Sequence, residues 1–362
     1  MRTITITMHR ANYGAILQAY ALQQTLYSIG YDNLLLNYYL QPTNIYLKVN
    51  SSNIIDAFKT LYINIFTLLR HKEMASSLRS FADFNDKYLN LTSPYNTIEE
   101  LNANPPLADC YITGSDQVFN EIQNRFLRDV RFLNFGDATT KRISYAASLT
   151  TYDMSDDSKE YSKKSLKRFD MISLRETQAK DYFENLTGLE CHTHLDPVFL
   201  LNKQDWIDFA VEPRIKKPYI LCYPLLRNKN FQAIINRLKK ETGLSVVSIQ
   251  TNPIKSIKAD YYIFDASPQE FIGFFKNASI IISTSFHGTA FSIVFEKPFY
   301  VLIKEYGAQR MIDLLDMLNL SSQIITNNKF ITSNEMDFSK PNEIIRQERM
   351  RAIEYLKSLD EL

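Results

Sequence analysis

The chain alternates between short runs of β-branched and aromatic residues and longer segments whose apolar positions recur at helical spacing. The first run, residues 3–8, predicts a strand. Residues 14–29 follow with the period of a helix, and Gly30 stands where a helix commonly ends. Residues 33–38 predict the next strand. This order is typical of a parallel sheet in an α/β protein.

The rest of the chain repeats this alternation in two series. The first series predicts further strands of the same sheet at 109–113, 142–147 and 170–174. The second begins near Pro218 and predicts strands at 219–223, 244–249, 261–264, 280–283 and 298–303, with helices at 231–241 and 268–276. We therefore predict an α/β protein with two Rossmann-like, doubly wound domains that face each other across a cleft.

The expected domain boundary lies in the segment 196–205. The N-terminal domain is predicted to cover residues 1–200 and the C-terminal domain residues 206–335. Residues 54–89 read as a mostly helical insertion in the first domain, and the charged segment 343–359 reads as a helix that packs back on it.

The insertion carries an apolar stripe at helical spacing. Its members are Ile54, Phe58, Leu61, Ile65 and Leu69, and the basic residues nearby are Lys59, Arg70, Lys72 and Arg79. A helix of this kind can lie in a membrane interface, although such a stripe more often packs on the body of its own protein. Both interpretations stay open at this point.

Net charge and cysteine content argue against several classes of protein. The 362 residues include 41 Lys and Arg and 40 Asp and Glu, a net charge of +1, which argues against nucleic-acid binding through bulk charge. Three widely spaced cysteines favour a reducing compartment over disulfides or a zinc site. Neither a signal peptide nor a run of eighteen apolar residues is visible, so we expect a cytoplasmic protein.

Four predicted strands are followed by polar residues, at the sheet edge where α/β proteins bind ligands. After the first strand, Asn12, Gly14 and Gln18 surround a predicted helix start, whose free N–H groups could hold an anion. The plain alternative is a turn in which Asn12 caps the helix.

The second junction contains Ser115, Asp116 and Gln117 after a glycine. Asp116 could accept a proton from a substrate hydroxyl, or this segment could simply cap the next helix. The third junction contains Arg175 and Glu176. A buried arginine needs a partner, so Glu176 could pair with it structurally, or its guanidinium could bind a phosphate or carboxylate.

The fourth junction contains Ser285, His287 and Gly288, and we expect a helix to begin at about Thr289. A histidine beside a helix start can donate a proton near neutral pH, which makes His287 a candidate for chemistry. His71, His192 and His194 lie outside such junctions, and no set of metal ligands is evident. Dinucleotide-binding, phosphate-loop, nucleophile-elbow and zinc-protease motifs are absent from the sequence.

Five segments together resemble the polysaccharide pyruvyl transferase family, in the order that the family has. They are 12–22 (NYGAILQAYAL), 114–120 (GSDQVFN), 173–176 (SLRE), 195–201 (LDPVFLL) and 285–291 (SFHGTAF). The resemblance implies a fold like that of the GT-B glycosyltransferases. It also implies transfer of the pyruvyl group of phosphoenolpyruvate onto two hydroxyls of a sugar to form a cyclic ketal, with no cofactor besides this co-substrate.

The resemblance gives the candidate residues roles. The donor's phosphate and carboxylate need cations and helix starts rather than a metal, so Arg175 and Arg310 are candidate ligands, with Lys304 a weaker one. His287 would be the acid or would hold the leaving phosphate, and Asp116 would be the base. Ser285 and Gly288 are assigned to the donor side. Residues assigned to the acceptor or the cleft are Asn12, Gln18, Ser115 and Gln117.

One departure from the family concerns the donor site. Some members have Arg-Leu-His-Gly where this chain has residues 285–288, Ser-Phe-His-Gly, so another cation must make that arginine's contact. Members that build capsule or exopolysaccharide resemble the chain most. Their acceptors are commonly lipid-linked sugars at the inner membrane face, which implies peripheral membrane contact as one option for the insertion.

Two alternatives remain at this point. A GT-B glycosyltransferase that uses a nucleotide sugar would need a similar architecture, and preference for a nucleotide diphosphate over phosphoenolpyruvate would favour it. A non-catalytic scaffold of a polysaccharide-assembly complex would keep its partners after loss of Arg175 and His287.

Overall fold

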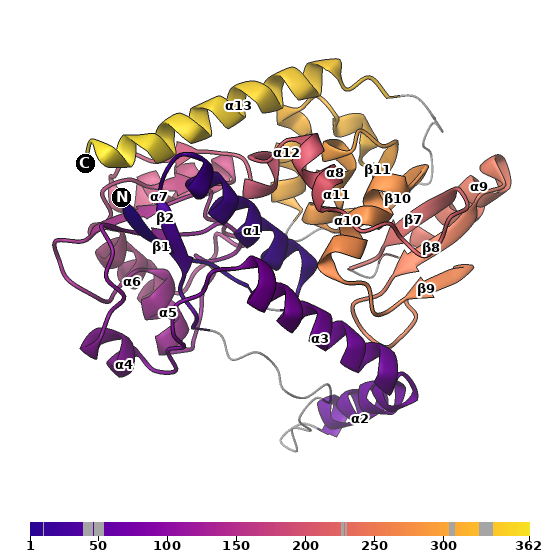
Figure 1. Cartoon of the computed structure of the whole chain (residues 1–362), viewed down its shortest axis with the longest axis horizontal. Coiled ribbons are helices and arrows are strands. Elements are labelled where there is room, and N and C mark those ends of the chain that lie inside the picture. The colour runs from indigo at the N-terminus through magenta and orange to yellow at the C-terminus, as the bar shows by residue number, and fades with distance from the viewer. Residues whose placement is uncertain are drawn as a thin grey trace.

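The computed structural model describes residues 1–9, 11–38, 46, 54–225, 228, 230–303, 308–325 and 336–362. Its two largest sheets are both parallel, and one is built from each half of the chain (Figure 1). These sheets confirm the predicted α/β class. The division into domains at residues 200 and 206 stays a prediction.

The first sheet has the strand order β2-β1-β3-β4. Its strands are β1 (Arg2–Ile6), β2 (Asp32–Leu35), β3 (Cys110–Thr113) and β4 (Lys141–Ser144). The strand predicted at 170–174 is shorter than expected, because only β5 (Ser173–Leu174) is extended, and it pairs with β6 (His192–Thr193). Single bridges at Ile143–Met171 and Ala147–Leu174 join this pair to the edge of the sheet.

The second sheet has the order β11-β10-β7-β8-β9. Its strands are β7 (Tyr219–Tyr223), β8 (Ser245–Ile249), β9 (Tyr261–Ile263), β10 (Ile280–Ser283) and β11 (Phe299–Val301), each close to its predicted position. β7 and β10 are buried along their whole length, as expected for strands that are covered on both faces.

The described helices fall into two groups. Those in the first half of the chain are α1 (Tyr13–Ser28), α2 (Ile54–Leu69), α3 (His71–Tyr88), α4 (Ile98–Ala103), α5 (Arg125–Arg131), α6 (Asp156–Leu166) and α7 (Thr177–Thr187). Those in the second half are α8 (Lys203–Phe209), α9 (Phe231–Thr242), α10 (Pro268–Asn277), α11 (Phe286–Val294), α12 (Gln309–Met317) and α13 (Ser339–Lys357). Three short 3₁₀ helices complete this set: η1 (Pro197–Phe199), η2 (Ser321–Gln323) and η3 (Ser358–Asp360).

Local sequence explains how α1 is placed. Asn12 caps it by accepting a hydrogen bond from the Ala15 amide, and Gly30 follows its end with a φ of 91°. Most of the helix is buried, and the Tyr13 ring stacks on Phe271 of the second half at a centroid distance of 4.4 Å. The start of α1 therefore lies where the two halves of the molecule meet.

The helix α13 runs along both halves of the molecule (Figure 1). Near its C-terminus, the Tyr355 hydroxyl donates to the backbone oxygen of Ser144 in β4. Earlier in the helix, Arg349 donates to the backbone oxygens of Phe199 and Leu201, between the two halves. The last helix thus ties the end of the chain back to the first sheet.

Among the residues that the structure describes, no helix is long and apolar enough to cross a membrane.

Candidate active site

A cluster of buried charges lies between the two halves, with Arg175 at its centre. Arg175 follows β5, and its side chain is only 3% exposed. Its Nε lies 3.1 Å from Glu176 Oε1, its Nη1 2.5 Å from Asp196 Oδ2, and its Nη2 4.0 Å from Asp116 Oδ1. Burial alone would lower the pKa of Arg175, but these three carboxylates raise it above its ordinary value.

Asp196 connects this arginine to His287 of the second half. The two nitrogens Arg175 Nη1 and His287 Nε2 lie 2.5 Å and 3.5 Å from the same oxygen, Asp196 Oδ2. The other oxygen of Asp196 accepts from the Val198 amide at the start of η1. Burial would raise the pKa of Asp196, but His287, Arg175 and that amide together lower it to about 2. Asp196 is therefore an ionised carboxylate that holds the Arg175 guanidinium and faces the His287 imidazole.

Phe286 and Arg310 approach the cluster from the second half. The Arg175 guanidinium lies 4.3 Å from the centroid of the Phe286 ring, and the Arg310 guanidinium lies 5.9 Å from it. Burial, and then repulsion from Arg175, lower the pKa of Arg310. Two guanidinium groups are thus held beside one aromatic ring, a contact that suits cations.

Three buried nitrogens of this cluster lack a hydrogen-bond partner in the described part of the chain: Arg175 Nη2, Arg310 Nε and His287 Nε2. A buried polar atom without a partner is costly, so several in one place indicate a site that a ligand completes. If His287 is neutral, the cluster has two positive charges, on the two arginines, and three negative ones, on Asp116, Glu176 and Asp196. The cluster then has a net charge of −1. An anion would therefore bind most favourably together with a proton, which offsets the added negative charge.

Gly14 brings the first half of the chain against His287. A Cβ atom added at Gly14 would lie 2.0 Å from His287 Nδ1 and 2.5 Å from its Cγ, so only glycine allows this approach. The His287 side chain is 11% exposed and therefore has little room to move away. The predicted first and fourth junctions consequently meet in space, at the start of α1 and the start of α11.

Other predicted residues at these junctions serve local structure. Asn12 caps α1, and the buried amide of Gln18 donates to Thr7 Oγ1 and the backbone oxygen of Ala15. Ser285 caps α11 by accepting a long hydrogen bond of 3.4 Å from the Gly288 amide. The prediction that this helix begins at Thr289 was therefore wrong, because the Ser285 cap starts it at Phe286 and places His287 in its first turn.

The second junction contributes one side chain to the cluster. Asp116 is 6% exposed and has a left-handed φ of 66°, and it faces Arg175. Ser115 donates to the backbone oxygen of Ala146, and Gln117 accepts from Asn120. Lys304, the weaker donor candidate, lies outside the described residues.

Sequence reasoning missed two acidic groups here. Asp196 lies in one of the five segments, but an Asp before a Pro also suits a turn, and its partners are distant in sequence. Asp313 of α12 has a pKa raised by burial, and its Oδ2 lacks a partner in the described structure. No sequence signal singled out Asp313.

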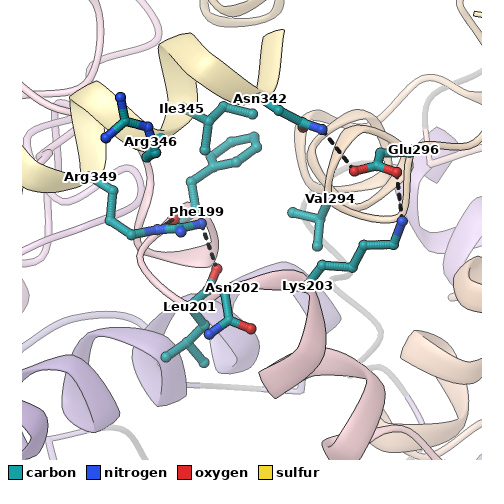
Figure 2. Close-up of a pocket in the computed structure, with 10 residues that line it drawn as sticks. All are labelled: Phe199, Leu201, Asn202, Lys203, Val294, Glu296, Asn342, Ile345, Arg346 and Arg349. Carbon is teal, nitrogen blue, oxygen red and sulfur yellow. Dashed lines mark hydrogen bonds and ion pairs between the residues drawn. The ribbon is translucent and has the colours of Figure 1, made fainter. Parts of the chain in front are cut away.

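A separate pocket lies between α13, the start of α8 and the turn after α11 (Figure 2). Glu296 accepts hydrogen bonds there from Asn342 and Lys203, at 2.8 Å and 2.6 Å. These contacts join the last helix to the turn after α11 and to the start of α8, and none of the charged cluster's residues lines this pocket.

The chain resembles one protein family and several solved structures. The family model described as polysaccharide pyruvyl transferase matches residues 12–303. A solved structure from Listeria monocytogenes, described as a UDP-N-acetylglucosamine 2-epimerase, is 9% identical with a TM-score of 0.51 and covers 99% of this chain and 89% of its own. No curated protein matches the chain.

Two further solved structures have lower scores. The UDP-GlcNAc 2-epimerase of Methanocaldococcus jannaschii is 12% identical with a TM-score of 0.48, over 98% of this chain and 92% of its own. Arabidopsis thaliana UGT89C1 with UDP-L-rhamnose is 11% identical, also at 0.48, over 99% and 97%. The likeness to the Listeria structure shows the fold alone, and that fold is of the GT-B type.

Proposed function

Because the chain belongs to the polysaccharide pyruvyl transferase family, we propose that it moves the pyruvyl group of phosphoenolpyruvate onto two hydroxyls of a sugar. The product is a cyclic pyruvate ketal, and inorganic phosphate is released. The observation that carries the proposal is the set of three unpartnered buried nitrogens, on Arg175, Arg310 and His287.

These nitrogens suit the donor's chemistry. Phosphoenolpyruvate carries a phosphate and a carboxylate, and planar guanidinium groups bind both with directed hydrogen bonds. Arg175 is already held by Glu176 and Asp196, so only its Nη2 remains for a ligand. Arg310 has fewer close contacts with the carboxylates of the cluster. It would therefore supply most of the electrostatic attraction between the site and phosphoenolpyruvate.

Arg310 can also replace the arginine that other family members have in the Arg-Leu-His-Gly pattern. The position of that arginine is taken here by Ser285, whose hydroxyl caps α11. Arg310 comes from the next helix, and its guanidinium reaches the ring of Phe286, the residue that follows Ser285. We therefore assign the missing cationic contact to Arg310.

The reaction needs a proton at one carbon and loses two from the hydroxyls. A proton added to C3 of phosphoenolpyruvate makes a methyl group and leaves C2 electron-poor. The first hydroxyl attacks C2 and releases its proton, then the bond from C2 to the phosphate oxygen breaks. The second hydroxyl attacks C2, which closes the ring, and its proton passes to the departed phosphate. The proton of the first hydroxyl balances the one added to C3.

His287 and Asp116 have the proposed proton-transfer roles. His287 would donate a proton to C3 or to the departing phosphate. Asp196 would keep the imidazole of His287 in place and stabilise its protonated form. Asp116, which faces Arg175, would accept the proton of the first hydroxyl. All the groups in these steps belong to the chain or to the co-substrate.

The acceptor is a sugar or polysaccharide, as the family implies. We place the reaction in the biosynthesis of a capsule or exopolysaccharide in the cytoplasm, on a lipid-linked acceptor.

Calorimetric titration with phosphoenolpyruvate tests the donor assignment, with UDP-N-acetylglucosamine as the parallel ligand. We expect phosphoenolpyruvate to bind and Arg310→Gln to weaken binding by about tenfold to a hundredfold, the loss typical of a charge-assisted hydrogen bond. The matched control is Arg237→Gln, at an exposed ion pair with Glu241 on α9.

Equal affinity in the two variants would contradict the donor assignment. Binding of UDP-N-acetylglucosamine alone would replace the proposal with glycosyl transfer.

A further inference from the structure

The helix α2 presents its apolar side to solvent. Twelve large apolar side chains are exposed in the described part of the chain, and half of them belong to this one helix. The six are Phe58, Leu61, Tyr62, Ile65, Leu68 and Leu69, here called the α2 stripe. Their exposed fractions run from 50% to 73%. A surface helix of a globular protein normally has the opposite orientation, with its apolar stripe facing the core.

The stripe is continuous and occupies one face. Counted from Phe58, its members stand at positions 0, 3, 4, 7, 10 and 11, the spacing of a single helix face. The opposite face turns toward the protein and carries both apolar and polar side chains: Ile63, Asn64 and Phe66 are half-buried, and Thr67 is 2% exposed with its hydroxyl donating to the backbone oxygen of Ile63. The helix therefore has apolar side chains on both faces, and those of its outer face are left uncovered.

The helix is held firmly although its outer face is uncovered. At its end, Arg70 Nε donates to the backbone oxygen of Pro253, and the guanidinium lies 4.0 Å from the centroid of the Phe264 ring. The next helix, α3, packs its Phe81 ring 4.9 Å from Tyr13 at the start of α1. Figure 1 shows α2 at the far end of α3, away from both sheets. The stripe is thus presented on a fixed, projecting support.

Charge around the stripe favours an anionic surface as its occupant. Residues 54–80 contain four basic side chains, Lys59, Arg70, Lys72 and Arg79, against two acidic ones, Asp56 and Glu73. This segment therefore has a net charge of +2, and because Lys59 pairs with Asp56 and Arg70 with Glu73, Lys72 and Arg79 supply that excess. A second copy would bring this positive segment against itself, whereas anionic lipid headgroups complement it.

We infer that α2 lies in the interface of an anionic phospholipid bilayer and docks the protein there. The stripe would enter the boundary between headgroups and acyl chains, and the flanking lysines would remain at the headgroups. A convex helix with large apolar residues suits that geometry, since a bilayer covers a projecting surface without needing a matching groove. The inference is independent of the reaction that the active site performs.

Cosedimentation of the full chain with vesicles tests this inference without any substrate. The vesicles are phosphatidylcholine alone, or phosphatidylcholine mixed with phosphatidylglycerol. We expect binding to the anionic vesicles and weaker binding to the neutral ones. The double variant Leu61→Gln, Ile65→Gln should bind the anionic vesicles at least about tenfold more weakly, because two large apolar side chains no longer leave water.

The matched control is Leu107→Gln, Met350→Gln, which removes two exposed apolar side chains elsewhere and should bind as wild type does. Lys59→Gln with Lys72→Gln should weaken binding only to the anionic vesicles, by about tenfold at roughly 1 kcal/mol per charge after partial screening. Circular dichroism confirms that each variant is folded.

Two results would overturn the inference. The first is a wild-type protein that sediments with neither kind of vesicle, or equal binding by the stripe and control variants. The second is a concentration-dependent dimer in analytical ultracentrifugation that Leu61→Gln, Ile65→Gln dissociates, without any vesicle binding, which would make the stripe an interface between copies.

Discussion

Two buried histidines in this protein have opposite surroundings. His194 is 5% exposed, its Nδ1 lies 2.7 Å from Ser173 Oγ, and its ring is 4.5 Å from that of Tyr355. His287 is 8% exposed, but its Nε2 has no hydrogen-bond partner in the described structure and faces Asp196 at 3.5 Å. Burial is therefore common to both histidines, and the unsatisfied Nε2 beside other unsatisfied donors is the reason why we expect His287, and not His194, to take part in chemistry.

Exchange of each histidine for glutamine should separate the roles of His194 and His287. His287→Gln should lower turnover of phosphoenolpyruvate to phosphate by about a hundredfold to ten-thousandfold, the usual contribution of a general acid, with the melting temperature nearly unchanged. His194→Gln should do the reverse, because its ring packs on Tyr355: about 1–3 kcal/mol of stability is lost and turnover of the folded fraction is kept. The same loss of turnover in both variants would remove the distinction.

The charged cluster should respond as a structural unit when its centre is removed. Arg175→Ala leaves Asp196 and Glu176 buried without their cation, which should lower the free energy of unfolding by about 3–5 kcal/mol. Arg310→Gln removes a cation that pairs less closely, so its stability should stay within about 1 kcal/mol of wild type. Chemical denaturation measures both. Similar losses of unfolding free energy in the two variants would contradict the idea that Arg175, and not Arg310, holds the cluster together.

A methyl group at Gly14 sharpens the assignment of His287. Gly14→Ala forces the imidazole out of position, and turnover should fall by about tenfold to a hundredfold, since catalytic geometry tolerates little displacement. Gly30→Ala is the matched control, because no atom lies within 4 Å of its added Cβ. Its φ of 91° should cost about 1 kcal/mol of stability and leave turnover unchanged. Normal turnover in Gly14→Ala would show that the imidazole adapts.

The smallest effect concerns acid stability. Burial lowers the pKa of His194 from 6.5 to about 3, so the folded protein keeps this imidazole neutral while the unfolded chain takes up a proton. Stability should therefore fall as the pH drops below about 6.5, by about 2 kcal/mol at pH 5. His194→Gln should remove this part of the slope in denaturation curves between pH 7 and pH 5. If stability changes with pH equally in His194→Gln and wild type, the pH dependence arises from other titratable groups.

The periodicity of the sequence predicted most strands of the two sheets and the longer helices, because the apolar residues of these elements recur regularly. The predicted strand at 170–174 shortened to β5, whose pairing with β6 is not a local property. Helices α4 to α8 and α12 were not predicted; each spans eleven residues or fewer, so the helical period repeats only a few times in it.

For the site, the junction residues Asp116, Arg175 and His287 do come together, whereas Gln18 turned out to be bonded within its own half. Asp196 was missed because its role depends on a contact between the two halves of the chain. The α2 stripe illustrates a further limit: helical spacing shows that an apolar face exists, but not whether the protein covers it.

The central claim is that Arg175 Nη2, Arg310 Nε and His287 Nε2 form the binding site for the anionic donor. A crystal structure of the protein with phosphoenolpyruvate tests it most directly. We expect phosphate or carboxylate oxygens within hydrogen-bond distance of these three nitrogens, between the starts of α1 and α11. Phosphoenolpyruvate bound elsewhere, with these nitrogens satisfied by protein side chains or water, would show that the cluster is not the donor site.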